Sequence, residues 1–117
     1  MKPPPENLEA RTAEFAANIR SFARKLPRTI SNMEDVKQLV RASGSVAANC
    51  IEANESLGEK DKLLHFQISR KEAKECGLWL RLVHIGEAAA LDKQRNILAQ
   101  ESHELRFILS AIIKKLE

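Results

Sequence analysis

Residues 36–51, VKQLVRASGSVAANCI, decide the fold class, because their apolar side chains repeat at the spacing of one face of an α-helix. The positions three and four residues apart on that face are Val36, Leu39, Val40, Ser43, Val46, Ala47, Cys50 and Ile51. Many of them are small, and small side chains allow a neighbouring helix to approach closely. Gly44 costs about 1 kcal/mol relative to alanine inside a helix, so we expect a packing reason for it.

Upstream of this stretch, a first helix is expected to begin at Glu6 or Asn7 and to end at Pro27, because the residue before proline avoids the helical region. Its apolar seam is Leu8, Thr12, Phe15, Ile19, Phe22 and Leu26. The second helix, which contains residues 36–51, is expected to open at Ser31 or Asn32, where Ser31 and Glu34 fit a capping box.

Downstream, Ser56 and Glu59 fit another capping box, and a third helix is predicted over 59–88. Its expected inward positions are Leu64, Ile68, Leu78, Leu82 and Ile85. A second apolar stripe carries Cys76, Trp79 and Val83, and we expect it to form a contact between subunits. A fourth helix is predicted from Asp92 to Leu116.

Composition agrees with this helical pattern. The chain has 117 residues, which is the size of one domain, and only 4% of them are aromatic, with four Gly and four Pro. We therefore predict an all-α protein, an antiparallel up-down four-helix bundle over 8–117, preceded by a Pro-rich segment over 1–7. A bundle of this size buries enough surface to need no cofactor.

Several function classes lack the residues they require. Cys50 and Cys76 match no metal-binding pair, and the predicted helices place both among apolar neighbours. His65, His84 and His103 show no HxxxH or ExxH spacing, and no nucleotide-binding glycine motif occurs. We expect no enzyme activity, no metal and no cofactor. Because no long apolar run or signal peptide is present, we expect a cytoplasmic protein without a membrane segment.

Two polar groups stand out. Basic residues gather at the end of the first helix: Arg20, Arg24, Lys25 and Arg28. A group of this kind can bind the phosphates of RNA or DNA, but a solvated helix face explains the same pattern. Charged and polar residues also meet between the second and third helices: Arg41, Asn49, Glu52, Lys71, Glu72 and Glu75. We expect these residues between the two helices to form a largely buried network. The network either stabilises the packing of the helices, forms a subunit contact or serves as a functional site.

The segments QLVRASGSVAANCIEAN (38–54), RKEAKE (70–75) and LWL (78–80) resemble the four-helix bundle protein family, also called the 23S rRNA intervening sequence protein family, over about 8–116. The resemblance implies a left-handed up-down bundle assembled into a ring, a homopentamer. The chain is similar also to the accessory protein of diversity-generating retroelements, which is a basic pentameric barrel that associates with a reverse transcriptase and nucleic acid. The family's polar motif falls on Arg41, Ser45, Asn49, Glu52, Lys71, Glu72 and Glu75, none with a catalytic role; Cys50 departs from it.

The resulting hypothesis is a non-enzymatic homo-oligomeric bundle that acts as an interaction module on RNA or DNA. The net charge of one chain is +3, and a pentamer would carry about +15, which amplifies a weak basic patch. The alternative is a structural adaptor that binds a protein partner and no nucleic acid. Clustering of the helix-one basic group with Arg81 or Lys114 on one face favours nucleic acid, and dispersal among Asp and Glu favours the adaptor.

Overall fold

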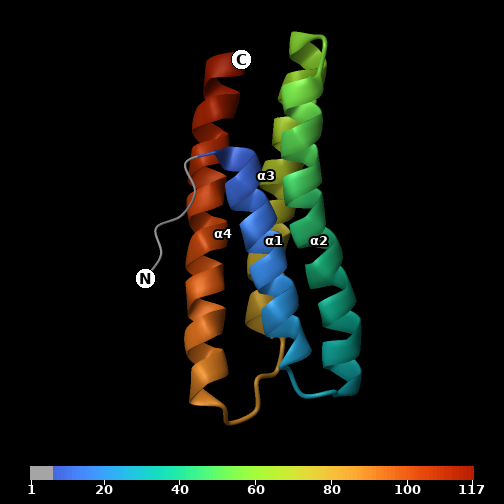
Figure 1. Ribbon diagram of the computed structural model, residues 1–117, viewed down its shortest axis with the longest axis vertical. Coiled ribbons are helices and arrows are strands. Elements are labelled where there is room, and N and C mark those ends of the chain that lie inside the picture. Colours follow the sequence, from blue (N-terminus) through green and yellow to red (C-terminus); the bar gives the residue numbers. More distant parts are fainter. Residues whose placement is uncertain (1–6) are drawn as a thin grey trace.

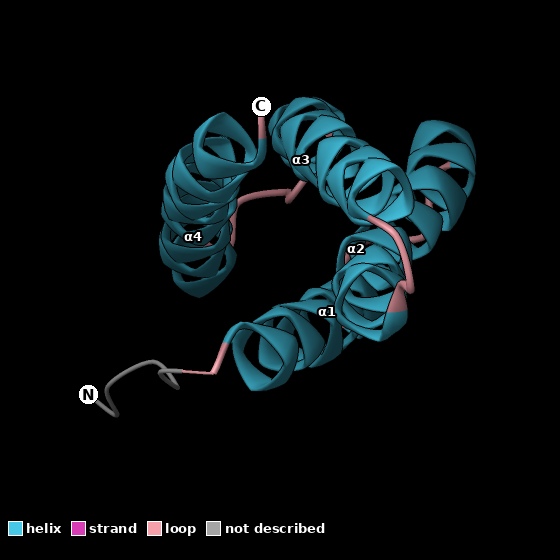
Figure 2. Cartoon of the chain, turned by 90° about the horizontal axis from the view of Figure 1, so that it is seen from above, coloured by secondary structure: helices cyan, strands magenta, loops and turns pink. Residues whose placement is uncertain are grey.

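The computed structural model describes residues 7–117, which form four helices joined by short loops (Figure 1). These are α1 (Leu8–Arg24), α2 (Ile30–Glu55), α3 (Glu59–Leu82) and α4 (Ala89–Leu116), and residues 7–117 contain no strand. Consecutive helices run in opposite directions, and each packs on the next, with α4 returning to α1 (Figure 1 and Figure 2). The predicted all-α, four-helix architecture is confirmed. Except for Asn7, the predicted Pro-rich segment 1–7 lies outside the described residues.

The first helix is shorter than its neighbours, and this divides the core into two parts. Helix α1 has 17 residues against 24 to 28 in the others, so one end of the bundle consists of α2, α3 and α4 alone (Figure 1). The larger apolar cluster contains Phe15 and Phe22 of α1. The smaller cluster lies toward the three-helix end and contains Cys50, Ala53, Phe66, Leu109 and Ile113.

Side-chain caps fix where the first two helices begin. Asn7 Oδ1 accepts a hydrogen bond from the Ala10 amide at 3.2 Å, which confirms the expected start of α1. Helix α2 begins at Ile30, before the expected Ser31 or Asn32, because Thr29 Oγ1 accepts from the Asn32 amide at 3.1 Å.

The buried side chain of Asn32 connects two loops instead of capping a helix. Its Nδ2 donates to the carbonyl oxygens of Pro27 at 2.9 Å and His84 at 2.7 Å, and its Oδ1 accepts from the His84 amide at 2.8 Å. The main chain at His84 therefore leaves the helical hydrogen-bond pattern, and α3 ends at Leu82, not at the expected Ala88.

The other two predicted caps are wrong. Ser56 follows α2 and its Oγ donates to the Glu52 carbonyl at 2.8 Å, so it is not free to cap α3, whose N-cap Gly58 has no side chain. Helix α4 begins at Ala89, three residues before the expected Asp92, and the Asp92 carboxylate instead accepts from Arg95 at 3.0 Å within the first turn.

The two apolar stripes of α3 have exchanged roles relative to the prediction. The seam Phe66, Ser69, Ala73, Cys76, Leu80 and Val83 faces the core and is buried throughout. Most of the stripe that was expected to be buried points outward, with Leu64, Leu78 and Leu82 exposed by 50%, 39% and 53%. Ile68 is partly buried, and Ile85 packs against the core as expected. Both seams alternate steps of three and four residues, so spacing does not distinguish them. The outward seam carries the charged side chains of Lys71 and Glu75 at its centre, and burying both without partners would be costly.

No helix among residues 7–117 is both long and apolar enough to cross a membrane.

Candidate functional site

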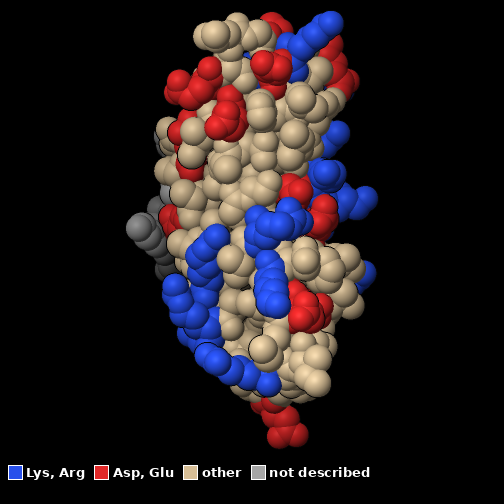
Figure 3. Space-filling model, turned by 90° about the vertical axis from the view of Figure 1, so that its right-hand side faces the viewer, with Lys and Arg blue, Asp and Glu red and all other residues tan. Residues whose placement is uncertain are grey.

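The basic group at the end of α1 divides into free and engaged side chains. Arg24, Lys25 and Arg28 are exposed, and none forms an ion pair with a carboxylate of residues 7–117. Figure 3 shows Lys and Arg side chains next to one another on the lower part of the face formed by α1 and α2. Three adjacent cations without counter-charges produce a positive potential that attracts anions.

Arg20 belongs to the packing between α1 and α2, so it does not join the free cations with which the sequence grouped it. Its guanidinium donates to the Ala16 carbonyl at 3.0 Å and to Ser43 Oγ and the Val40 carbonyl at 3.4 Å. A Cβ on Gly44 would lie 3.2 Å from Arg20 Nη2. The glycine therefore leaves room for this side chain, which supplies the packing reason expected from the sequence.

The polar residues between α2 and α3 form two separate clusters, so the prediction of one largely buried network is wrong. In the first cluster, Arg41 Nη1 lies 3.3 Å from Glu72 Oε2 and Arg41 Nη2 lies 3.3 Å from Glu75 Oε1. Only the Glu72 carboxylate is buried, whereas Arg41 is half exposed. The contact to Glu72 Oε2 is an ion pair without hydrogen-bond geometry, so this oxygen lacks a donor among the described residues.

The second cluster centres on Asn49 and includes a histidine that the sequence reasoning missed. Asn49 Nδ2 donates to the carbonyl and hydroxyl oxygens of Ser45 at 2.9 and 3.0 Å, and Asn49 Oδ1 lies 2.9 Å from His65 Nδ1. Glu52 and Lys71 are exposed and belong to neither cluster. Arg41 and Asn49 thus connect α2 to α3, whereas Ser45 contacts only Asn49 within α2.

The residues expected at a subunit contact lie mostly inside the bundle. Cys76 and Val83 are core residues, and Trp79 is half-buried against the same core. Burial, with smaller contributions from Glu72 and Glu75, raises the pKa of the Cys76 thiol from 9.0 to about 12. The predicted outward stripe is thus replaced by Leu64, Leu78 and Leu82.

Neither cysteine has the environment of a nucleophile. Burial also raises the pKa of the Cys50 thiol, which lies 3.4 Å from Ser69 Oγ in the apolar core. Among residues 7–117, no group of three His, Cys, Asp or Glu side chains is arranged to hold a metal ion.

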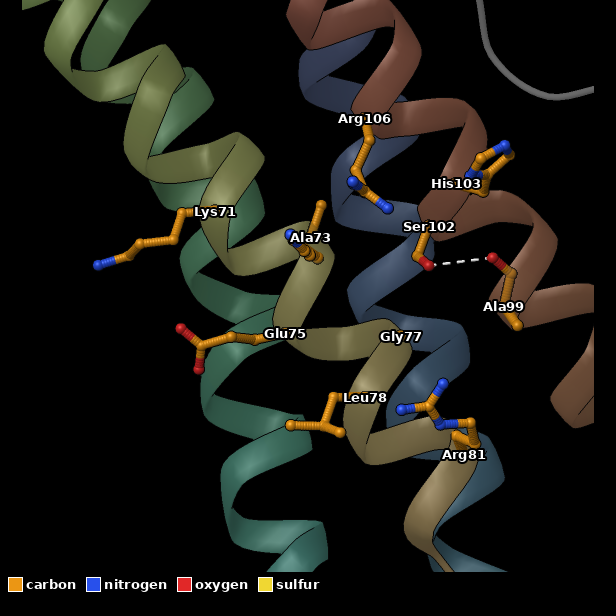
Figure 4. A pocket seen from close by; sticks show the side chains of 11 residues that line it. Lys71, Ala73, Glu75, Gly77, Leu78, Arg81, Ala99, Ser102, His103 and Arg106 are labelled. Carbon is orange, nitrogen blue, oxygen red and sulfur yellow. Dashed lines mark hydrogen bonds between the residues drawn. The ribbon is translucent and has the colours of Figure 1, made fainter.

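A groove between α3 and α4 gathers cations that the sequence reasoning did not group. It has a volume of about 560 Å³, and its lining includes Lys74 and Arg81 of α3 and Arg106 of α4. Figure 4 shows Arg81 and Arg106 extending toward the space beside Gly77 and Ser102, whereas Lys71 and Glu75 point away from α4. Sequence spacing within α3 relates Lys74 to Arg81, but their approach to Arg106 depends on how α4 packs.

Neither Arg81 nor Lys114 joins the basic group of α1. Arg81 lines the groove between α3 and α4, and Lys114 is in the last turn of α4, at the opposite end of the bundle from Arg28 (Figure 1). The described chain therefore carries two separate basic surfaces.

Comparison with known proteins places this fold in a family. The family model described as 23S rRNA-intervening sequence protein matches residues 8–111. A crystal structure of a protein with unknown function, from the S23 ribosomal protein family of Bacteroides thetaiotaomicron, is similar with a TM-score of 0.80 and 27% identity. The alignment covers 92% of this chain and 99% of that one. None of the curated proteins matches this chain.

Proposed function

The chain belongs to the 23S rRNA-intervening sequence protein family, and from this premise we propose that it is a self-associating, non-enzymatic module that binds nucleic acid through its basic surface. The observation that carries the proposal is the group Arg24, Lys25 and Arg28, which is exposed and has no acidic partner within residues 7–117. Side chains of this kind bind phosphates and release counterions, which provides affinity for RNA or DNA without sequence preference.

Self-association rests on the outward stripe of α3. Leu64, Leu78 and Leu82 lie on one face at steps that an approaching helix can cover, and each is roughly half exposed. A second copy of the chain is the proposed occupant of this stripe. The resemblance to the family implies a ring of five, in which the basic surfaces of all the copies would repeat around the assembly.

The test combines light scattering with a salt-titrated binding assay on single-stranded RNA and DNA. In the variant Arg24→Ala/Lys25→Ala/Arg28→Ala, three positive charges are lost from exposed positions. The matched control Lys93→Ala/Lys114→Ala/Lys115→Ala loses the same charge from exposed positions of α4. We expect the first variant to weaken binding to all sequences by about tenfold and to flatten the salt dependence, while the control stays closer to the parent.

Two results would overturn the proposal. Absence of binding by the parent even at about 50 mM salt would remove the nucleic-acid role and leave the adaptor that binds a protein. Equal losses in the Arg24/Lys25/Arg28 variant and the matched control would show that net charge matters but that this surface does not.

A further inference from the structure

We propose that the groove between α3 and α4 is a second binding site, and that it takes the phosphodiester backbone of a nucleic-acid strand. This inference rests on the proposed function, because it assigns the same class of ligand to a surface that the helix-one group does not include. Its basis is a set of cations that converge on one groove from two helices (Figure 4).

The charges around the groove are unbalanced. Lys74, Arg81 and Arg106 line it, whereas Lys71 and Leu78 are also in the lining but extend away from α4 (Figure 4). Glu75 is the only carboxylate among the lining residues. That carboxylate lies 3.3 Å from Arg41, on the side of α3 away from α4. None of the four lining cations has an ion pair within the described part of the chain. The groove therefore retains uncompensated positive charge.

Helix α4 separates its own charges between two sides. Glu101 and Glu104 face α1, where Arg11 lies 2.7 Å and 3.2 Å from their carboxylates. Arg106 faces α3 and is half-buried with no hydrogen-bond acceptor among the described residues. The acids that would neutralise the groove are thus held on the opposite side of the same helix. A guanidinium without an acidic partner attracts an added anion.

The floor of the groove is formed by small side chains. Small residues line it between the cations, namely Ala73, Gly77, Ala99 and Ser102. Ser102 Oγ donates to the Ala99 carbonyl at 3.0 Å, so its hydroxyl hydrogen is already used. No Phe, Tyr or Trp is among the lining residues, and His103 is the only aromatic ring there. The cations therefore outnumber the aromatic rings in the lining, which favours contact with phosphates over base stacking.

These features match a phosphate backbone. Arg81 and Arg106 supply planar guanidinium groups, which bind two phosphate oxygens at once, and Lys74 adds a flexible point charge. Lys74 and Arg81 are seven residues apart on α3, or about 10 Å along the helix axis. The groove therefore presents cations at more than one point along its length, which suits a chain of linked phosphates better than a single phosphate.

The experiment compares three full-length variants that each lose three positive charges. The groove variant is Lys74→Ala/Arg81→Ala/Arg106→Ala, and the other two are the Arg24/Lys25/Arg28 and Lys93/Lys114/Lys115 alanine variants. Binding of a single-stranded oligouridine and an oligothymidine is measured from about 50 to 200 mM salt. We expect the groove variant to bind about tenfold more weakly than the parent and to lower the salt slope by about 2, uniformly for both strands.

Because Arg106 is half-buried, circular dichroism first tests whether the triple variant folds. If it does not, Lys74→Ala/Arg81→Ala removes two exposed side chains and should lower the slope by about 1.4. A parent that binds neither strand refutes the proposed function and this inference together. A parent that binds, with a groove variant that keeps its affinity and slope, refutes the groove alone. If the groove variant loses binding to an acidic peptide but keeps its binding to both strands, the groove belongs to a protein partner. That result would also refute the proposal that the groove binds nucleic acid.

Discussion

Replacing the two ends of the outward α3 stripe, Leu64→Lys/Leu82→Lys, should separate the subunits without unfolding them. Complete burial of a leucine side chain contributes about 1.5 to 3 kcal/mol, and about half of each side chain is exposed in the single chain. Covering each one in an assembly is therefore worth about 1 kcal/mol. Loss of both removes about 2 kcal/mol from each subunit contact, which weakens association about 30-fold before any cost of burying lysine.

The matched control is Ile97→Lys/Phe107→Lys on α4, where the original side chains are exposed by 51% and 63%. Light scattering after size-exclusion chromatography, over a range of protein concentrations, gives the mass of each species, and thermal melting checks the fold. We expect the α3 variant to dissociate at concentrations where the parent and the α4 control stay assembled. A parent that is monomeric at micromolar concentration, or dissociation of the α4 variant in place of the α3 variant, would refute the reasoning.

Three other predictions concern stability and thiol chemistry. Arg41→Ala should lower the free energy of unfolding by about 2 to 3 kcal/mol, because it leaves the buried Glu72 carboxylate unpaired. Glu72→Gln should change the free energy of unfolding by less than about 1 kcal/mol. Denaturant titration of both variants measures the difference. Gly77→Ala should stabilise α3 by about 1 kcal/mol, since the new Cβ would lie 3.7 Å from its nearest neighbour, and Gly44→Ala should gain less, since its Cβ would lie 3.2 Å from a guanidinium; a lower melting temperature for Gly77→Ala would contradict this. Because burial raises the pKa of the Cys76 thiol from 9.0 to about 12, the unfolded chain loses this proton first, so stability should fall as pH rises above about 9, and a Cys76→Ala variant should show a smaller fall.

The sequence was sufficient for those features that depend on one helix at a time. The seam from Leu8 to Leu26 contains Phe15, Ile19 and Phe22, and the structure buries all three in the core. The start of α1 was expected at Glu6 or Asn7, and the structure places the cap at Asn7. In both cases the deciding interactions lie within a few residues of each other, so local rules apply directly.

Features that depend on how two helices pack were not available from spacing. Helix α3 has two seams of equal period, and following the large aliphatic residues led to the exposed one. Its charged centre, Lys71 and Glu75, was the signal that could have identified it. The core instead uses small residues such as Ser69 and Ala73, which permit close packing against α2, where Ser69 Oγ donates to the Val46 carbonyl at 2.8 Å.

The site showed the same division between local and long-range information. Arg24, Lys25 and Arg28 are adjacent in sequence and were grouped correctly as exposed cations. Arg20 was grouped with them because the sequence does not reveal that its guanidinium reaches the Ser43 hydroxyl on the neighbouring helix. The groove escaped detection because Arg106 comes from a different helix than the other cations, and its position depends on the packing of α4.

The most direct test of the central claim is the salt dependence of binding between the intact protein and a single-stranded RNA. We predict binding at about 50 mM salt that weakens steeply and log-linearly toward about 200 mM, with little preference between RNA sequences. The Arg24/Lys25/Arg28 and groove variants should each show a shallower slope than the parent. No binding at the lowest salt, or binding whose strength does not change with salt, would contradict the account.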